Sequence, residues 1–149
     1  MRAEQSVGKH GQNIAASSMS QLGIEMVEQI GSPVKLIPVQ GVPRKDVFRV
    51  VFGEKVSGDH RGILYGGRSV LAETKTILDR NLRYSDLREH QPGRLTSHAT
   101  FGGLSLLVWV HGSGVYIMEW PIEGFTEGKS ITPEKAQALR IENLEALRG

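Results

Sequence analysis

Two carboxylates and one lysine stand close together in the middle of the chain, in the stretch GDHRGILYGGRSVLAETKT that spans residues 58–76. Glu73 and Lys75 are two residues apart, so on a β-strand they would share one face. The residues just before them are apolar, and charges at the end of a core-like strand need a partner or a function. Asp59 comes from the strand expected before. Two carboxylates brought together repel each other unless a hard cation lies between them.

The chemistry that such a group supports is metal-assisted hydrolysis of a phosphodiester. Magnesium prefers oxygen ligands and lets a substrate phosphate complete its shell, and it activates water and offsets charge on the reacting phosphate. Lys75 would orient or polarise the attacking water, or stabilise the developing charge. The alternative is an exposed strand on which Glu73 and Lys75 form an ordinary surface ion pair, since E-T-K tripeptides are common.

The turn between the two expected strands decides whether the carboxylates can meet. The pair Gly66-Gly67 supplies positive φ for a tight turn. A two-residue turn would place position 59 opposite Thr74, and the side chains of Asp59 and Glu73 would then point apart. Their convergence therefore predicts an odd-length connection or a bulge, unless Asp59 lies just before regular pairing begins.

Apolar periodicity and turn residues predict the elements that would hold this hairpin. Their order predicts a single α/β domain over residues 1–149, with one mixed β-sheet flanked by helices. Trp109 and Trp120 lie on apolar strands and are expected in the core. The expected elements are a helix over 9–22 that stops at Gly23, a strand over 24–30, an arm over about 38–57, hairpin strands over 59–65 and 68–75, a helix from Pro92 to Gly102, strands over 104–110 and 115–120, and a helix over 132–148.

Length and composition indicate one globular domain. A chain of 149 residues can bury a sizeable core. It contains no cysteine, which excludes disulfides, thiolate metal sites and cysteine nucleophiles. No apolar run is long enough for a transmembrane helix and no secretory signal is visible, so we expect a cytoplasmic protein without a membrane partner. The five histidines have no tight spacing, which argues against a zinc site.

Positive charge is concentrated in the middle of the chain. Residues 35–94 carry 12 Lys/Arg and 7 Asp/Glu, a net charge of +5, whereas residues 1–34 net −1 and residues 95–149 net −2. An electropositive middle suits a phosphate-binding surface, although a mixed solvated surface with a mild bias is the alternative. The candidate DNA contacts are Arg44, Lys45, Arg49 and Lys55 on the arm, Arg61, Arg80 and Arg83 outside it, and Phe48 as a ring to stack on an unpaired base.

The order of these motifs resembles the PD-(D/E)xK nuclease superfamily, with Gly58-Asp59 and Glu73-Thr74-Lys75 at its acidic motifs. More narrowly, residues 9–120 resemble the RecU-type Holliday junction resolvases of Gram-positive bacteria and their phages. The shared features are the helix that ends in Gly23, Ser32-Pro33-Val34 in place of that family's T-P-V, an inserted arm known there as the stalk, Glu89-His90-Gln91 similar to its H-Q, Phe101-Gly102-Gly103 before an apolar strand, and Val115-Tyr116 in the next strand.

This resemblance implies a restriction-endonuclease-like core and a phage-type endonuclease that resolves four-way junctions by symmetric paired nicks. The metal ligands would be Asp59, Glu73 and the Thr74 carbonyl, for magnesium or for manganese in its place. Lys75 would be catalytic, and Gln91 would lie near the scissile phosphate. The stalk would enter or brace the centre of the branched DNA. The enzyme would be a homodimer, because two symmetric nicks need two symmetric sites.

The first helix departs from the family pattern. Where the family has an acidic residue that points at the metal, this sequence reads Gly11-Gln12-Asn13. Gln12 or Asn13 would then offer an amide oxygen, which binds a cation more weakly because it carries no charge. The alternatives to a junction resolvase are a restriction- or flap-type nuclease with the same chemistry and a non-catalytic DNA-binding protein on the same fold.

Overall fold

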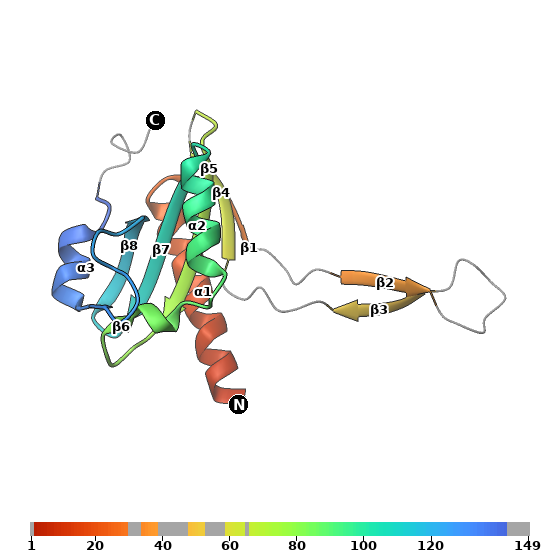
Figure 1. Ribbon diagram of the computed structural model, residues 1–149, viewed down its shortest axis with the longest axis horizontal. Helices are drawn as coiled ribbons and strands as arrows, with labels where there is room; N and C mark the ends of the chain where they lie inside the picture. The colour runs from red at the N-terminus through yellow and green to blue at the C-terminus, as the bar shows by residue number, and fades with distance from the viewer. Residues whose placement is uncertain (1, 30–33, 39–47, 53–58, 65, 143–149) are drawn as a thin grey trace.

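A five-stranded mixed sheet forms the centre of the molecule (Figure 1). The computed structural model describes residues 2–29, 34–38, 48–52, 59–64 and 66–142, with side chains for residues 10–24, 60–64 and 66–142. Only β5 (Ser69–Thr76) and β7 (Leu104–His111) are parallel neighbours in this sheet, and the other neighbouring strands are antiparallel. The predicted α/β architecture with a mixed sheet flanked by helices is therefore confirmed. The strand order is β1 (Ile24–Gln29), β4 (Asp59–Leu64), β5 (Ser69–Thr76), β7 (Leu104–His111) and β8 (Gly114–Trp120).

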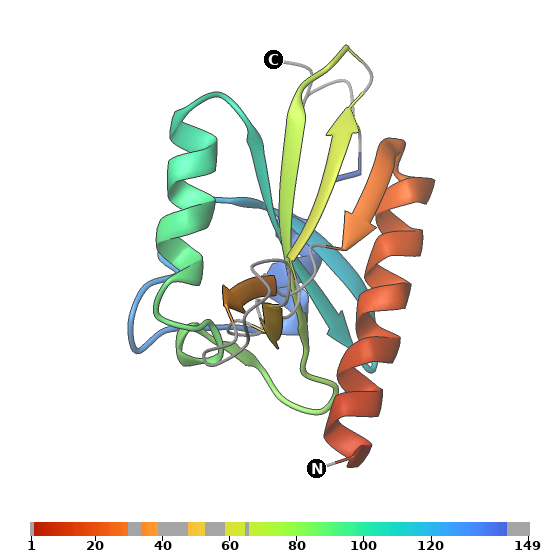
Figure 2. The ribbon, with the colours of Figure 1, turned by 90° about the vertical axis from the view of Figure 1, so that its right-hand side faces the viewer.

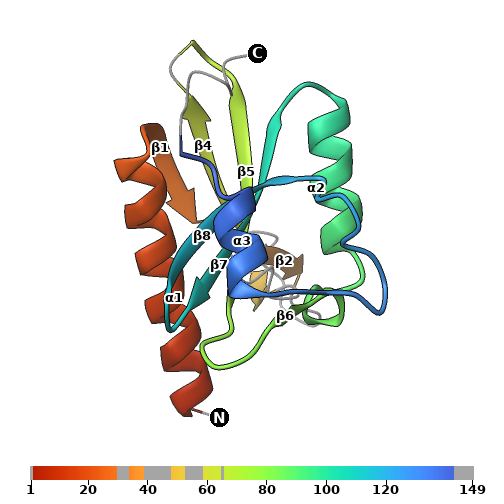
Figure 3. The same ribbon diagram turned by 90° about the vertical axis from the view of Figure 1, so that its left-hand side faces the viewer.

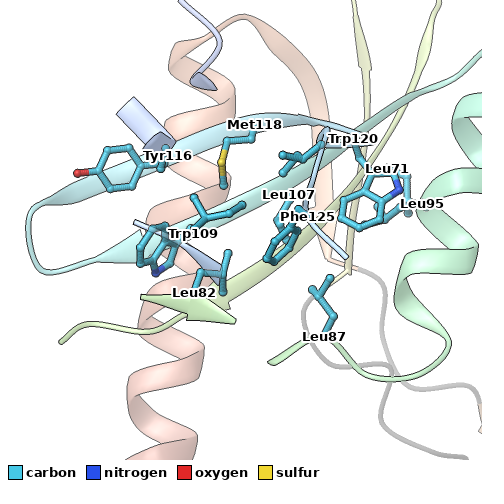
Figure 4. Packing of buried hydrophobic residues seen from close by; sticks show 13 residues of the cluster. Leu71, Leu82, Leu87, Leu95, Leu107, Trp109, Tyr116, Met118, Trp120 and Phe125 are labelled. Atoms are coloured by element: carbon cyan, nitrogen blue, oxygen red, sulfur yellow. The ribbon is translucent and has the colours of Figure 1, made fainter. Parts of the chain in front are cut away.

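The two faces of the sheet carry two separate apolar cores, because side chains alternate along each strand. Helix α1 (Arg2–Gln21) covers one face and α2 (Gln91–Thr100) the other (Figure 2). On β5, Val70 and Ala72 belong to the α1 core, whereas Leu71 belongs to the α2 core. The α2 core also holds Trp109 and Trp120, as predicted (Figure 4). Residue parity on β5 therefore decides which helix a side chain meets.

Helix α1 lies directly against β5. It begins at Arg2, earlier than the expected start at residue 9, and Gly23 follows its end with a φ of 96°. Gly11 is buried, and a Cβ atom built there would overlap Thr76 Oγ1. Only a residue without a side chain permits this close approach. Among the described helices, none is long and apolar enough to cross a membrane.

Residues 65–68 connect β4 to β5, and three of them, 65–67, lie between the hydrogen-bonded residues Leu64 and Arg68. The Leu64 backbone N–H donates to the Arg68 carbonyl at 2.9 Å, which closes the loop. Gly66 and Gly67 have φ values of 100° and 93°, which glycine adopts without strain. Of the alternatives that the sequence left open, the odd-length connection is therefore the one confirmed, since the register runs without a bulge from Ile63–Ser69 to Asp59–Glu73.

A compact polar loop joins β5 to α2. Asp86 accepts two hydrogen bonds from the Arg80 guanidinium, at 2.7 and 2.8 Å, and one from the Arg83 backbone N–H at 2.7 Å. These bonds fix the short 3-10 helix η1 (Tyr84–Asp86) that leads into α2. Nearby, β6 (Leu82–Arg83) pairs with β9 (Ser130–Ile131), a small sheet that the apolar pattern did not predict.

The last predicted helix is shorter than expected. Thr132 caps α3 (Pro133–Leu139) by accepting from the Lys135 backbone N–H at 3.2 Å, as the sequence predicted. The expectation of one helix over 132–148 is wrong at Arg140, which is extended and bridges to Met118 on β8. The Ile141 N–H then donates to the Ile117 carbonyl at 2.8 Å. Pairing with the free edge of β8, beside α3 in Figure 3, replaces the helical bonds that apolar periodicity alone favoured.

The predicted arm contains a separate two-stranded sheet. β2 (Val34–Pro38) pairs antiparallel with β3 (Phe48–Phe52), and the pair stands away from the five-stranded sheet in Figure 1. Its first strand begins at Val34, four residues before the expected start of the arm at residue 38. Pro38 is thus the last residue of β2, which is an edge strand of its two-stranded sheet, and proline is tolerated on edge strands.

The close packing of α1 on β5 can be tested with Gly11→Ala. Overpacking costs about 1–3 kcal/mol, and the better helix propensity of alanine returns about 1 kcal/mol. We expect a lower free energy of unfolding in urea, by about 1 kcal/mol. Thr76→Ala removes the opposing hydroxyl and methyl groups, so the double variant should recover most of this loss. Strictly additive effects in this cycle would contradict the contact.

Candidate functional site

The sheet register brings positions 59 and 73 together. Asp59 and Glu73 are direct partners in the β4–β5 pairing. Because Leu64 and Arg68 pair through a backbone hydrogen bond, strict alternation makes 59 and 73 a non-hydrogen-bonded pair, with Cα atoms about 4.5 Å apart. Directly opposed positions share one face of a sheet. The side chain of Asp59 lies outside the described part of the chain, but its register position is the one that convergence with Glu73 requires.

Glu73 is a buried carboxylate, with 1% of its surface exposed. Gln91 Nε2 donates to Glu73 Oε1 at 2.6 Å, and Lys75 Nζ lies 3.5 Å from the same oxygen. Gln91 is itself held in place, because its Oε1 accepts from the Arg88 backbone N–H at 2.7 Å. The first turn of α2 and the end of β5 therefore contribute to one cluster of polar side chains, in which Gln91 and Glu73 are 18 residues apart in sequence.

The second oxygen of Glu73 gives the best test of a metal site. Glu73 Oε2 is buried and has no hydrogen-bond partner among the described residues. An unpaired buried carboxylate oxygen is costly, and a cation is the partner that removes the cost. By the alternation in the pairing, the Thr74 carbonyl points toward the β4 side of β5. Two carboxylate positions and one carbonyl are the oxygen donors that magnesium or manganese prefers.

This donor set is small. Among the residues whose side chains are described, no group of three or more His, Cys, Asp or Glu is placed to hold a metal ion. Asp59 is not in that set. A site of this kind would leave several coordination positions to water and to a substrate phosphate, as magnesium sites usually do.

Gln12 is not brought to Glu73. It lies on α1, next to Gly11, which faces Thr76 on the other side of β5. Gln12 is half-buried and makes an interaction within the molecule. Its role as a metal ligand stays a prediction that the positions of α1 and Glu73 do not support.

The predicted DNA contacts divide into three groups. Arg61 is exposed on β4, two residues from Asp59 and therefore on the same face. Arg83 is exposed, whereas the Arg80 guanidinium is engaged by Asp86. This ion pair raises the pKa of Arg80 and lowers the pKa of Asp86, chiefly through their hydrogen bonds. The arm residues Arg44, Lys45 and Lys55 lie outside the described residues, and the side chains of Phe48 and Arg49 on β3 do as well.

A hydrogen-bonded cluster of one histidine and two serines, which the sequence did not single out, lies at the other end of α2. Ser105 Oγ donates to the Leu95 carbonyl at 2.6 Å, so it accepts from His98 Nδ1 at 3.1 Å. His98 Nε2 is then the acceptor for Ser69 Oγ at 3.1 Å. A Cβ atom on Gly103 would overlap the His98 ring, so glycine leaves the space for it. The glycine pair before β7 was the signal in the sequence.

Burial lowers the pKa of His98, and the nearby charges of Arg61 and Arg68 lower it further. Arg68 is close because its guanidinium donates to the Gly102 and Gly103 carbonyls, at 3.2 and 3.4 Å. The ring is therefore neutral at pH 7, in agreement with its one donated and one accepted bond.

No protein-family model matches the sequence, and no curated protein matches it.

The unpaired oxygen of Glu73 predicts that divalent ions stabilise the protein. At a magnesium concentration ten times its dissociation constant, we expect a gain of about 1.4 kcal/mol in unfolding free energy, seen as a rise in Tm. Glu73→Gln should lose this rise for magnesium and manganese. Glu119→Gln, which removes an exposed carboxylate on β8, is the matched control and should keep it. A rise that survives Glu73→Gln would place the ion elsewhere.

The lowered pKa of His98 predicts an acid-sensitive term in stability. The unfolded chain binds a proton at about pH 6.5, but the folded protein does so only at lower pH. The free energy of unfolding should therefore fall as pH drops below about 6.5 and through the folded pKa. Urea denaturation at pH 7.5 and 5.5 should show a smaller loss in His98→Gln than in wild type. The exposed His90 provides the control His90→Gln, and an equal effect of both variants would reject the assignment.

Proposed function

We propose that this chain is a magnesium-dependent endonuclease that resolves four-way DNA junctions by symmetric hydrolytic nicks, on a restriction-endonuclease-like core. One observation carries the proposal. The register pair Asp59 and Glu73 lies on the sheet face where Lys75 and Gln91 reach the buried Glu73 carboxylate. The choice of a junction as substrate rests on the resemblance of the motif order to RecU-type resolvases.

Asp59, Glu73 and the Thr74 carbonyl would hold the divalent ion. When bound there, the ion would supply Lewis-acid stabilisation of the charge that develops on the phosphate during hydrolysis. The buried position of Glu73 favours this role, since a carboxylate in a site with little water interacts strongly with a cation. Arg61 lies exposed on the same face, and in this proposal it would contact the DNA phosphate next to the one that reacts.

Besides the divalent ion, the proposed active site contains a positive charge of its own, the ammonium group of Lys75. Its ammonium lies beside the Glu73 carboxylate, which favours the charged form. A charged ammonium can hydrogen-bond to the attacking water or to a phosphate oxygen, and it stabilises negative charge there. Hydrolysis forms a bond between the water oxygen and phosphorus and breaks one phosphate ester bond. A proton leaves the water and another reaches the departing oxygen.

Gln91 has a positioning role in this proposal. Its two amide atoms are engaged by Glu73 and by the Arg88 backbone. A direct contact with the scissile phosphate, which the resemblance implied, would have to use the second N–H of the amide, since the bond to Glu73 takes the first. Gln91 instead orients the Glu73 carboxylate, as groups behind a metal ligand commonly do.

Two further features belong to the proposal. The arm would enter or brace the junction, since β2 and β3 form a sheet of their own outside the core. A two-fold homodimer would place two active sites on opposite strands of the branched DNA, as paired nicks require.

Cleavage of labelled DNA tests the proposal. Wild type with magnesium should cut a four-way junction much faster than a three-way junction, a flap or a plain duplex. Glu73→Gln and Lys75→Met should lose at least about 100-fold in rate, and Gln91→Ala about 10- to 100-fold. Glu119→Gln should cut like wild type, and all variants should bind the junction in EDTA.

Each other outcome has a defined meaning. Equal cleavage of plain duplex and junction would favour a restriction-type nuclease and end the resolvase assignment. Binding without cleavage by wild type, with magnesium or manganese, would leave a non-catalytic DNA-binding protein.

A further inference from the structure

One strip of the sheet face remains open beside the candidate site. Helix α2 packs on β5, β7 and β8. On β4, one strand further out, Arg61 is exposed and Ile63 is 38% exposed. Both positions have the parity of Asp59, so they lie on the same face as Glu73. Ser69, opposite Ile63, is exposed as well. We call this surface between α2 and β4 the α2–β4 strip.

The flank of α2 that borders the strip can be deduced from its contacts. Gln91 is buried against the sheet, and Thr96 Oγ1 accepts from Trp120 Nε1 on β8 at 3.0 Å. At 3.6 residues per turn, Arg94 and Phe101 lie on the opposite flank, toward β4. Phe101 is 91% exposed at the end of the helix. The bonds from Arg68 to the Gly102 and Gly103 carbonyls hold the hairpin end beside the backbone that follows Phe101.

The walls of the strip are basic and contain no acid. Residues 60–72 and 90–118 include Arg61, Arg68 and Arg94 but no Asp or Glu. The nearest acidic positions are Asp59 and Glu73 of the candidate site, at one end of the strip, and Glu28 and Glu25 on β1, which are the register partners of Arg61 and Ile63. Between the candidate site and Phe101, a polyanion would therefore meet only basic charged side chains on the side of β4 that faces α2.

We propose that the α2–β4 strip binds a single DNA strand that runs from the Glu73 site to Phe101, where an unpaired base stacks on the exposed ring. The inference rests on the proposed function only in taking the polyanion to be DNA. Four residues separate Glu73 from Ser69 along β5, about 13 Å of strand. Arg61 is opposite Leu71, midway between these two positions, and it would meet a phosphate of that DNA strand. A basic track combined with an aromatic platform is the usual design of single-strand binding surfaces.

A second copy of the chain suits the strip poorly. A two-fold contact would set the arginines of one copy against the same arginines of the other. Their like charges would repel, whereas a phosphate backbone offsets them.

Binding of a fluorescein-labelled 12-nucleotide single-stranded oligodeoxynucleotide, measured by anisotropy in EDTA, tests the inference. Phe101→Ala should weaken binding by about 5- to 100-fold, the usual effect of removing one stacked base contact. Phe101→Trp should bind at least as tightly as wild type, and Phe101→Leu should bind as weakly as Phe101→Ala. Leu139→Ala, at an apolar side chain of similar size on α3 with 39% exposure, is the control and should bind like wild type.

The salt dependence gives a second readout. Arg61→Gln should reduce the slope of log Kd against log salt by about 0.7, the value expected for one phosphate of a single strand. Arg140→Gln removes an exposed arginine that pairs with Glu142 away from the strip, and it should leave the slope unchanged.

The inference is overturned if Phe101→Ala binds like wild type, or if Phe101→Leu restores binding and thereby shows a merely apolar contact. Sedimentation that shows a dimer in wild type and a monomer in Phe101→Ala would also overturn it, in favour of a second copy. The outcome is separable from that of the proposed function. Weaker binding by Phe101→Ala in a protein that never cuts DNA would sustain this inference alone. Junction cleavage with unchanged single-strand binding by Phe101→Ala would sustain only the nuclease.

Discussion

The length of one loop determines the whole candidate site. Three residues, 65–67, lie between the hydrogen-bonded residues Leu64 and Arg68. The resulting register sets Asp59 opposite Glu73. Side chains alternate across a sheet, so a connection one residue shorter would send the two carboxylates to opposite faces. Two consecutive glycines with positive φ make the longer loop possible. The functional geometry thus depends on backbone freedom far from the charged groups that it aligns.

Burial of Glu73 links stability to the proposed chemistry. A carboxylate with 1% exposure is costly unless hydrogen bonds and a counter-charge offset the loss of water. Gln91 and Lys75 provide this for one oxygen, and the other has no partner in the described part of the molecule. The fold thereby accepts a strained electrostatic position at the end of β5. Such positions are common at functional sites.

The sequence predicts what local pattern determines. The strongly apolar β7, the Pro92 start of α2 and the Thr132 cap of α3 were all recognised, because each depends on neighbouring residues. The sequence could not decide whether Asp59 is opposite Glu73 or opposite Thr74, since paired glycines permit loops of two or three residues. It also missed long-range bonds. The bond from Gln91 to Glu73 and the pairing of Ile141 with Ile117 depend on tertiary contacts that periodicity does not encode.

The two faces of the sheet differ in the groups that they bury, and this asymmetry limits where a substrate can approach. The α1 face is closed by apolar packing, with Gly11 pressed against Thr76. The α2 face contains Glu73, Gln91, Ser105 and His98, all joined by hydrogen bonds between α2 and the strands. Its uncovered part, along β4, bears Arg61. Among the described residues, the part of this face that α2 leaves uncovered beside Glu73 therefore lies along β4, where Arg61 provides positive charge.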